Sequence, residues 1–202
     1  MTILAVTSSA ATASAALLRD GRLILEQNAD PAKKHAETLV PLLQELLAAS
    51  GMPIEEVDAF AVDIGPGSFT GIRIGVCVVN ALAFARQKPV IAVDSLRALA
   101  EPHWETANSI CVLIDAGHDA SYTALYENGA CAMPPCMKET EALLASLSPD
   151  TLVLRDRMPR AAHLAMAAWR LRDAGVSAVA PLYVQPSQAE RLHKARGGKA
   201  HD

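Results

Sequence analysis

Residues 63–75 read DIGPGSFTGIRIG and form the most distinctive segment of the chain. An apolar run typical of a buried strand, residues 57–64, leads into it, and a long apolar run follows it. Two glycines permit backbone angles that other residues resist, and the proline between them stiffens the turn. A hydroxyl side chain after the turn can cap a following helix. The stretch therefore predicts a strand, a structural turn and a helix over residues 70–86. The turn residues are Gly65, Pro66, Gly67, Ser68, Thr70 and Gly71.

A strand, a glycine-rich turn and a helix start also form the geometry that binds phosphate. This turn lacks the lysine of a P-loop and does not match GxGxxG, so a structural turn is the favoured interpretation. A hydrolase elbow, GxSxG, would need glycines two residues on either side of Ser68. Pro66 and Thr70 stand at those places, so the sequence does not support a hydrolase.

The elements around this stretch follow a pattern that occurs twice. Hairpin signals at Asp20-Gly21 and Asn128-Gly129 each lie among three short apolar runs, which predicts two antiparallel meanders. Helical and strand patterns follow each meander; the predicted helices cover residues 32–49, 70–86, 138–147 and 161–173, and the later strands cover 57–64, 90–93 and 152–154. A short apolar run over residues 179–183 ends the pattern. We expect mixed sheets with flanking helices, hence an α/β protein.

The polar run EPHWETAN, residues 101–108, is the best place for a boundary. It divides the chain into a first lobe, residues 1–102, and a smaller second lobe, residues 103–202, with a polar C-terminal tail. Two lobes that each begin with three hairpin-linked strands resemble the actin/hexokinase/Hsp70 (ribonuclease H-like) superfold.

The helix over residues 70–86 is apolar on nearly all sides, and Arg73 and Asn80 are its polar side chains before Arg86. A helix on the outside of a sheet needs only one apolar stripe, so this helix needs cover on more than one face. We expect another subunit to cover the remainder. The alternative is that the chain's own packing hides it.

Composition narrows the class of protein. The chain has 202 residues, of which 51% are hydrophobic and 20% charged, so it has ample material for a core. Its net charge of -4 gives no global basic field, and a direct RNA-binding protein would usually show one. The four cysteines are not spaced as the ligands of a metal site are. No apolar run reaches the ~20 residues that a membrane span needs. We expect a cytoplasmic protein whose cysteines are reduced thiols and which has no metal, cofactor or membrane anchor.

The motif DIGPGSFTGIRIGV, preceded by HAETLVPLLQELL and followed by PVIAVDSLRALA, resembles the TsaB (YeaZ) family. The second half is similar through VLIDAGHDASYTALYENG and APLYVQP. The resemblance implies an actin-like fold in both lobes and an accessory, non-catalytic role in threonylcarbamoylation of the adenosine next to the tRNA anticodon. It implies a TsaD-like catalytic partner, a TsaE-like ATPase in the assembly, contact with tRNA only through the complex, and a homodimer in isolation.

The same resemblance places the partner interface on the helices over residues 35–49 and 70–86. The interface residues expected on these helices are His35, Leu39, Leu42, Leu43, Leu46, Ile72, Arg73, Val76, Val79, Asn80 and Ala83.

The alternative function is that of an ATP-binding ATPase or kinase of the superfold acting alone. Catalytic relatives hold a metal through HxxxH, but here Leu39 stands four residues after His35, so we expect no metal. A vestigial phosphate hairpin would comprise Thr7, Ser8, Asp115 and Gly117, with no acid or glycine in residues 7–12 to organise Mg²⁺. A third possibility is a scaffold that associates with itself through the same helices.

Overall fold

The computed structural model describes residues 1–32, 34–155 and 157–185. Its first sheet contains β1 (Thr2–Thr7), β2 (Ser14–Arg19), β3 (Arg22–Asn28), β4 (Ala59–Asp63) and β5 (Val90–Val93). Its second sheet contains β6 (Ser109–Gly117), β7 (Ala120–Glu127), β8 (Ala130–Glu139) and β9 (Leu152–Leu154). The α-helices are α1 (His35–Ser50), α2 (Phe69–Arg86), α3 (Ser95–Ala100), α4 (Thr140–Ser146) and α5 (Ala161–Arg170). Short 3₁₀ turns are η1 (Ile54–Glu56), η2 (Glu101–His103) and η3 (Arg172–Ala174).

The two sheets repeat one strand order. The first runs β3-β2-β1-β4-β5 and the second β8-β7-β6-β9. In each, an antiparallel meander is followed by a parallel neighbour of its first strand, β4 beside β1 and β9 beside β6. The hairpins predicted at Asp20-Gly21 and Asn128-Gly129 are confirmed, because all four residues have positive φ and join paired strands. The predicted α/β class with two mixed sheets is therefore confirmed.

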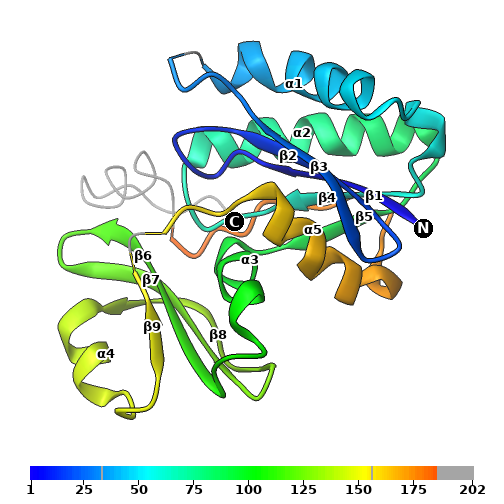
Figure 1. Ribbon diagram of the computed structural model, residues 1–202. Coiled ribbons are helices and arrows are strands. Elements are labelled where there is room, and N and C mark those ends of the chain that lie inside the picture. Colours follow the sequence, from blue (N-terminus) through cyan, green and yellow to red (C-terminus); the bar gives the residue numbers. More distant parts are fainter. Residues whose placement is uncertain (33, 156, 186–202) are drawn as a thin grey trace.

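Helices cover both faces of the first sheet (Figure 1). Alternate residues of β1 point to opposite sides. Leu4 and Val6 join the core under α1 and α2, whereas Ile3 and Ala5 join the core under α5. In the second sheet, β6 sends Ile110 and Val112 towards α3, and its other face packs against α4.

α5 lies in a different place from the one predicted. The sequence put residues 161–173 in the second lobe, but α5 packs on β1 and β2 of the first sheet and buries small apolar side chains there. The chain thus leaves the first lobe after α3, builds the second sheet, and returns. Helical periodicity identifies a helix but not the sheet that it covers, which explains the error. The predicted polar tail lies mainly outside the described residues.

Candidate functional site

The turn between β4 and α2 is held by close backbone approach. Gly65 has a φ of +98°, a conformation that side chains resist, and it forms a cis peptide bond with Pro66. A Cβ on Gly67 would lie 2.5 Å from the carbonyl oxygen of Ser9. Ser68 donates its backbone N–H to that same oxygen (2.7 Å), and its hydroxyl accepts from Gly71 N (3.2 Å). Ser68 is therefore the cap of α2.

Behind this turn lies a buried carboxylate. Asp63 is fully enclosed, and its oxygens accept from the hydroxyls of Thr7 (2.7 Å), Ser9 (2.5 Å) and Ser95 (2.6 Å) and from Gly65 N (2.9 Å). Burial raises the pKa of Asp63, and these hydrogen bonds partly oppose the shift. The cluster joins the ends of β1 and β4 to the start of α3.

We did not predict this cluster from the sequence. A signal was present, since an acid ends one buried strand while Thr7-Ser8-Ser9 ends its parallel neighbour. Two of the residues predicted for a vestigial phosphate hairpin point inward: Thr7 binds Asp63, and the Ser8 hydroxyl donates to Gly71 O (2.8 Å). Both are buried, so neither side chain is offered to a ligand.

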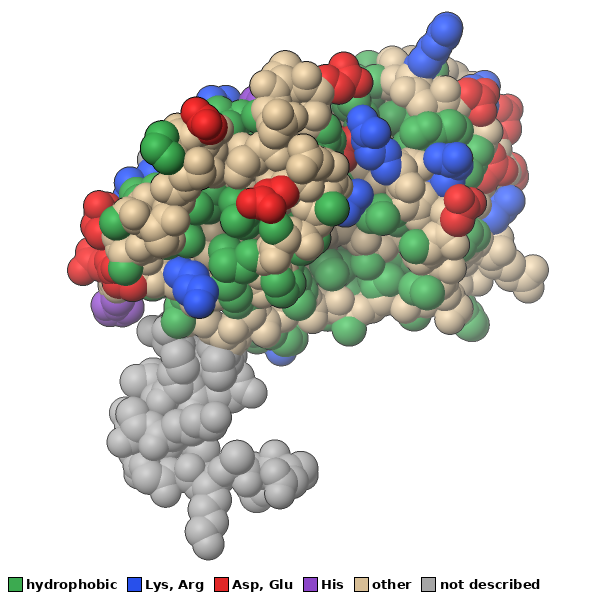
Figure 2. Space-filling model, turned by 90° about the horizontal axis from the view of Figure 1, so that it is seen from below, with side chains coloured by type: hydrophobic (Ala, Val, Ile, Leu, Met, Phe, Trp, Pro, Cys, Tyr) green, Lys and Arg blue, Asp and Glu red, His purple; other side chains and the backbone are tan. Residues whose placement is uncertain are grey.

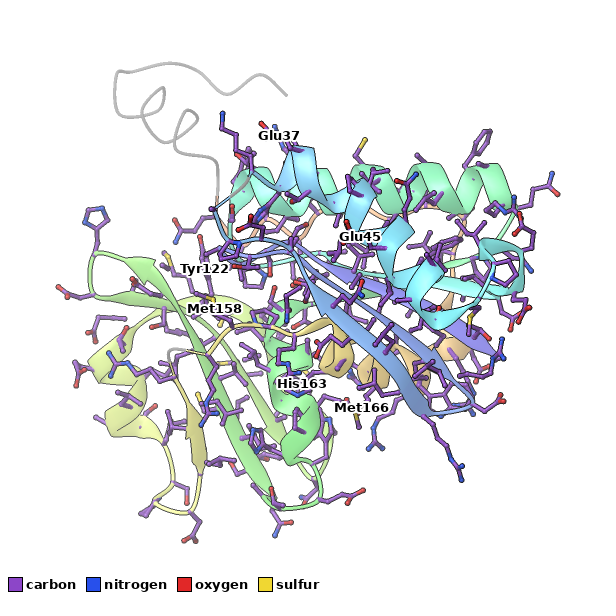
Figure 3. All side chains as sticks on the ribbon, turned by 45° about the horizontal axis from the view of Figure 1, so that its top comes forward. Glu37, Glu45, Tyr122, Met158, His163 and Met166 are labelled. Atoms are coloured by element: carbon purple, nitrogen blue, oxygen red, sulfur yellow. The ribbon has the colours of Figure 1, made fainter. Side chains whose placement is uncertain are left out.

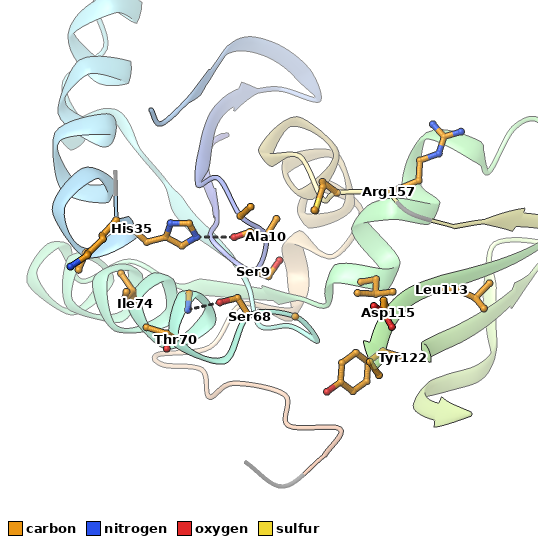
Figure 4. Close-up of a pocket in the computed structure, with 18 residues that line it drawn as sticks. Ser9, Ala10, His35, Ser68, Thr70, Ile74, Leu113, Asp115, Tyr122 and Arg157 are labelled. Carbon is orange, nitrogen blue, oxygen red and sulfur yellow. Dashed lines mark hydrogen bonds between the residues drawn. The ribbon is translucent and has the colours of Figure 1, made fainter. Parts of the chain in front are cut away.

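A cleft of about 890 Å³ opens between the two lobes (Figure 4). The first lobe contributes Ser9, Ser68 and Thr70, and the second contributes Asp115 and Tyr122. Tyr122 and Met158 lie where the lobes face each other (Figure 3). Gly117 lines a second cavity of about 750 Å³ rather than this cleft. Within the described residues no group of three His, Cys, Asp or Glu side chains is placed to hold a metal.

His35 begins α1 at the edge of this cleft. Its Nε2 lies 2.8 Å from the carbonyl oxygen of Ala10, which ties α1 to the loop after β1. Leu39, one turn later on α1, is completely buried. The geometry therefore gives His35 a contact within the chain.

Most residues expected at the partner interface lie in the core. Each of the following is at most 5% exposed: Leu39, Leu42, Leu43, Leu46, Ile72, Val76, Val79 and Ala83. They pack against β1, β2 and β4 in one cluster, because the apolar stripe of each helix faces the sheet it covers. His35 and Asn80 are half-buried and hydrogen-bonded within the chain, and Arg73 is exposed. These eight apolar side chains were expected at a partner interface. That expectation was wrong, because they are buried in the core.

The outer side of α2 nevertheless carries apolar side chains. Cys77, Ala81, Phe84 and Ala85 are exposed, Phe84 by 86%, and we call these four residues the α2 stripe. The whole helix has a mean hydropathy of 1.4, and 33% of its residues are buried. By length and composition alone it could cross a membrane, contrary to the expectation that no run does; the core helix of a soluble protein passes the same test.

α1 runs beside α2, and its outer side is more polar. Val40 is 48% exposed. Glu37 and Glu45 project from the same helix (Figure 3). The opposite face of the molecule, seen in Figure 2, carries hydrophobic side chains across its middle together with basic and acidic ones. Phe84 of the α2 stripe is the most exposed large apolar side chain in the described part of the chain, which makes the stripe a candidate surface for a partner.

Two lobes that repeat one strand order on either side of a cleft define an actin-like protein. The family model of TsaD, described as tRNA N6-adenosine threonylcarbamoyltransferase, matches residues 28–179. The solved structure of YeaZ from Pseudomonas aeruginosa superposes with a TM-score of 0.75 at 30% identity, covering 90% of this chain and 99% of that one. The chain belongs to the TsaB (YeaZ) family.

Curated relatives agree over part of their length. The tRNA threonylcarbamoyladenosine biosynthesis protein TsaB of Escherichia coli (strain K12) is 34% identical over 149 residues, 71% of this chain and 62% of the relative. A tRNA N6-adenosine threonylcarbamoyltransferase of Novosphingobium aromaticivorans is 37% identical over 93 residues, 43% of this chain and 26% of the relative. The chain thus spans less than two thirds of these curated relatives.

Proposed function

We propose that this protein is a non-catalytic subunit that binds and supports a TsaD-type enzyme, which transfers a threonylcarbamoyl group to the adenosine next to the tRNA anticodon. The observation that carries the proposal is the α2 stripe, an exposed apolar surface on a helix whose other side fills the core. An apolar surface of this kind on a soluble domain marks a place for another protein. Membership of the TsaB family supports tRNA threonylcarbamoyladenosine biosynthesis as the process in which the protein takes part.

The choice of a TsaD-type partner rests on shared ancestry. The TsaD family model covers α1 and α2 of this chain, so a TsaD-type enzyme brings a related pair of helices. Two related helix pairs can pack about an approximate two-fold axis, as in isologous dimers. Ala81 and Ala85 are small enough to let a partner helix approach closely. Two copies of this chain could pair in the same way, which makes a homodimer the competing occupant.

The accessory role is supported by the contents of the cleft. The side chains of Thr7 and Ser8 serve the core, and His35 binds the loop after β1. Among the described residues, His35 is the one histidine that lines the cleft, whereas metal chemistry would use a pair. The loop after β1, residues 7–12, contains no acid to organise Mg²⁺ for nucleotide chemistry. In this proposal a TsaE-like ATPase joins the assembly, tRNA is held through the complex, and the protein works in the cytoplasm.

A matched pair of charge substitutions tests the docking surface. Phe84→Glu places a charge in the α2 stripe, and Met166→Glu places one on α5, where Met166 is 40% exposed on the other side of the sheet. We expect Phe84→Glu to weaken binding of the TsaD-type subunit by at least about 30-fold, as for a hot-spot residue, and to lower tRNA modification in the reconstituted system.

Met166→Glu should bind like the unchanged protein, and both variants should keep their unfolding midpoints in urea. Calorimetry measures the affinity, and light scattering of the isolated protein reports the homodimer. Wild-type affinity in a folded Phe84→Glu variant would contradict the proposal.

A further inference from the structure

The last described segment of the chain crosses the first lobe, and we call it the strap. We define the strap as residues 176–185, which follow η3. Its first contact is a two-way backbone bridge: Val90 N donates to Val176 O (2.7 Å) and Val176 N donates to Val90 O (2.9 Å). β5 is the last strand of its sheet, so this bridge covers the start of an open edge.

The middle of the strap is held by Asn80 of α2. The Asn80 side-chain amide donates to Val179 O (2.8 Å), and Val179 N donates back to Asn80 Oδ1 (3.1 Å). One side chain thus satisfies both backbone groups of Val179, as a neighbouring strand would. Three residues further on, Leu182 N donates to the carbonyl oxygen of Ile64 (2.8 Å), beside the turn that precedes α2.

The far end of the strap builds a cluster of two aromatic rings and a guanidinium. Arg73 Nε donates to the hydroxyl of Tyr183 (2.8 Å), and the rings of Phe69 and Tyr183 stack with centroids 5.0 Å apart. The guanidinium carbon lies 4.0 Å from the Phe69 centroid and 5.6 Å from that of Tyr183. Phe69 remains 37% exposed and Tyr183 44% exposed.

This cluster continues the α2 stripe. Arg73 lies one helical turn before Cys77, so both occupy the same exposed side of α2. The two polar side chains in the body of this apolar helix, Arg73 and Asn80, are thus both used to hold the strap. Their role explains why an otherwise apolar helix contains them.

We infer that the strap is a built part of the docking surface, with Phe69, Arg73 and Tyr183 extending the α2 stripe over the first turns of the helix. The inference rests on the proposed function and commits to the same occupant, a TsaD-type subunit. Tyr and Arg are the residue types that most often dominate binding energies. The strap holds them in place before binding, which lowers the ordering cost of association.

The free donors of Arg73 indicate what the occupant presents there. Arg73 Nε donates to Tyr183 of the strap. None of the ion pairs formed among the described residues involves Arg73. A planar guanidinium whose outer N–H groups bind no other described residue matches a carboxylate in a two-point contact. We therefore expect an acidic side chain of the partner opposite Arg73.

The strap can be released without unfolding the lobe. Val176 is 49% exposed and Tyr183 44% exposed, so the ends of the strap are held by hydrogen bonds and by the stacking of Tyr183 on Phe69, without full burial in the core. A segment of this kind opens locally at a lower free energy than the whole fold. Asn80→Ala should free Val179 while leaving the core beneath α2 in place.

Three variants test the inference with the full chain and the purified TsaD-type subunit. Tyr183→Ala removes one ring of the cluster, and Asn80→Ala releases the strap that positions it. Arg172→Ala is the matched control, because its guanidinium lies 5.0 Å from the Trp169 ring in a similar pair beside α5. We expect at least about tenfold weaker binding for the first two variants and unchanged binding for the third.

Hydrogen exchange supplies a readout of the strap itself. Asn80→Ala should speed exchange of the Val179 amide by about tenfold, because that N–H loses its acceptor. Tyr183→Ala should weaken binding at high salt as well as at low salt, because salt screens charge interactions and not ring contact. Affinities of Tyr183→Ala and Asn80→Ala equal to that of Arg172→Ala would overturn the inference.

The outcomes separate the inference from the proposed function. Loss of binding in Phe84→Glu together with wild-type binding in both strap variants would overturn the strap's role and leave the docking surface standing. Tighter binding in Tyr183→Ala would show that the strap covers the surface instead of completing it, and would also overturn the inference. Wild-type binding in Phe84→Glu would overturn the proposed function itself.

Discussion

Ser8 and Gly71 are in direct contact where the loop after β1 meets α2. The Ser8 hydroxyl donates to Gly71 O at 2.8 Å, and a Cβ on Gly71 would lie 1.9 Å from the Ser8 carbonyl oxygen. Only a residue without a side chain fits at position 71, so this contact sets how closely the helix approaches the sheet.

Gly71→Ala should therefore destabilise the protein by about 3 kcal/mol, because the backbone of the loop after β1 or the whole helix must move. Gly75→Ala is the matched change on the same helix; its Cβ would lie 2.4 Å from the Ser8 hydroxyl, which can rotate away with the loss of its hydrogen bond to Gly71 O. We expect a cost of about 1 kcal/mol there, reduced by the better helix propensity of alanine. Urea unfolding measures both, and equal losses would contradict this account.

Substitutions on the two sides of α2 should change the free energy of unfolding by very different amounts. Val79 is completely buried, so Val79→Asp places an unpaired charge in the core and should cost about 4 kcal/mol or more. Phe84→Glu, on the exposed side, should change the free energy of unfolding by no more than about 0.5 kcal/mol. Circular dichroism during urea unfolding distinguishes them, and a folded Val79→Asp protein would show that α2 packs differently.

Asp63 should make stability depend on pH. Burial raises its pKa above the ordinary value of 3.8, so the folded state favours the protonated form. The unfolded chain loses that proton first, and the stabilising contribution therefore declines as the pH rises from about 4 through the folded-state pKa. Comparing Asp63→Asn with the unchanged protein from pH 4 to 8 should show the difference shifting in favour of the variant.

Asp94 complicates that comparison in a predictable way. Burial raises its pKa too, and the nearby charge of Asp63 adds to the shift. Asp63→Asn should lower the Asp94 pKa, which carboxyl-carbon NMR can follow. An Asp94 pKa that is unchanged in the variant would show that the two groups titrate independently.

Glu101 should stabilise the joint between the lobes. Its side chain is fully buried and accepts from Trp104 Nε1 (2.8 Å) and Arg170 Nε (2.5 Å). Glu101→Ala leaves the buried part of this network without its acceptor and should cost about 1–3 kcal/mol. Glu101→Gln keeps an acceptor for the indole and should cost less. In a Trp169→Phe background, Trp104 emission should shift to longer wavelength only in the alanine variant.

Local chemistry in the sequence was enough to predict the elements. The stretch predicted as a helix over residues 70–86 is α2, Phe69–Arg86, and the run predicted as a strand at residues 152–154 is β9. Asp20-Gly21 and Asn128-Gly129 marked their hairpins because few other pairs adopt two positive φ angles. These features depend on neighbours in the chain.

Features that depend on distant residues could not be read in the same way. Asp63 meets Ser95 only because β4 and β5 are parallel neighbours, and the strap meets Asn80 across 99 positions. The side of α2 that faces the sheet was also misjudged, because a helix apolar on nearly all sides carries no periodic signal of its buried face. Leu42 and Val76 were therefore expected at an interface and lie in the core.

The return of the chain to its first sheet has a consequence for synthesis. Side chains of β1, β2, β4 and β5 on one face of that sheet, among them Ile3, Ala5 and Ile91, pack against α5. A nascent chain that has emerged as far as residue 102 already contains all five strands of the sheet and α3, but it lacks the helix that supplies most of the cover on that face. The first lobe therefore reaches its full apolar burial only after the whole second sheet has been synthesised.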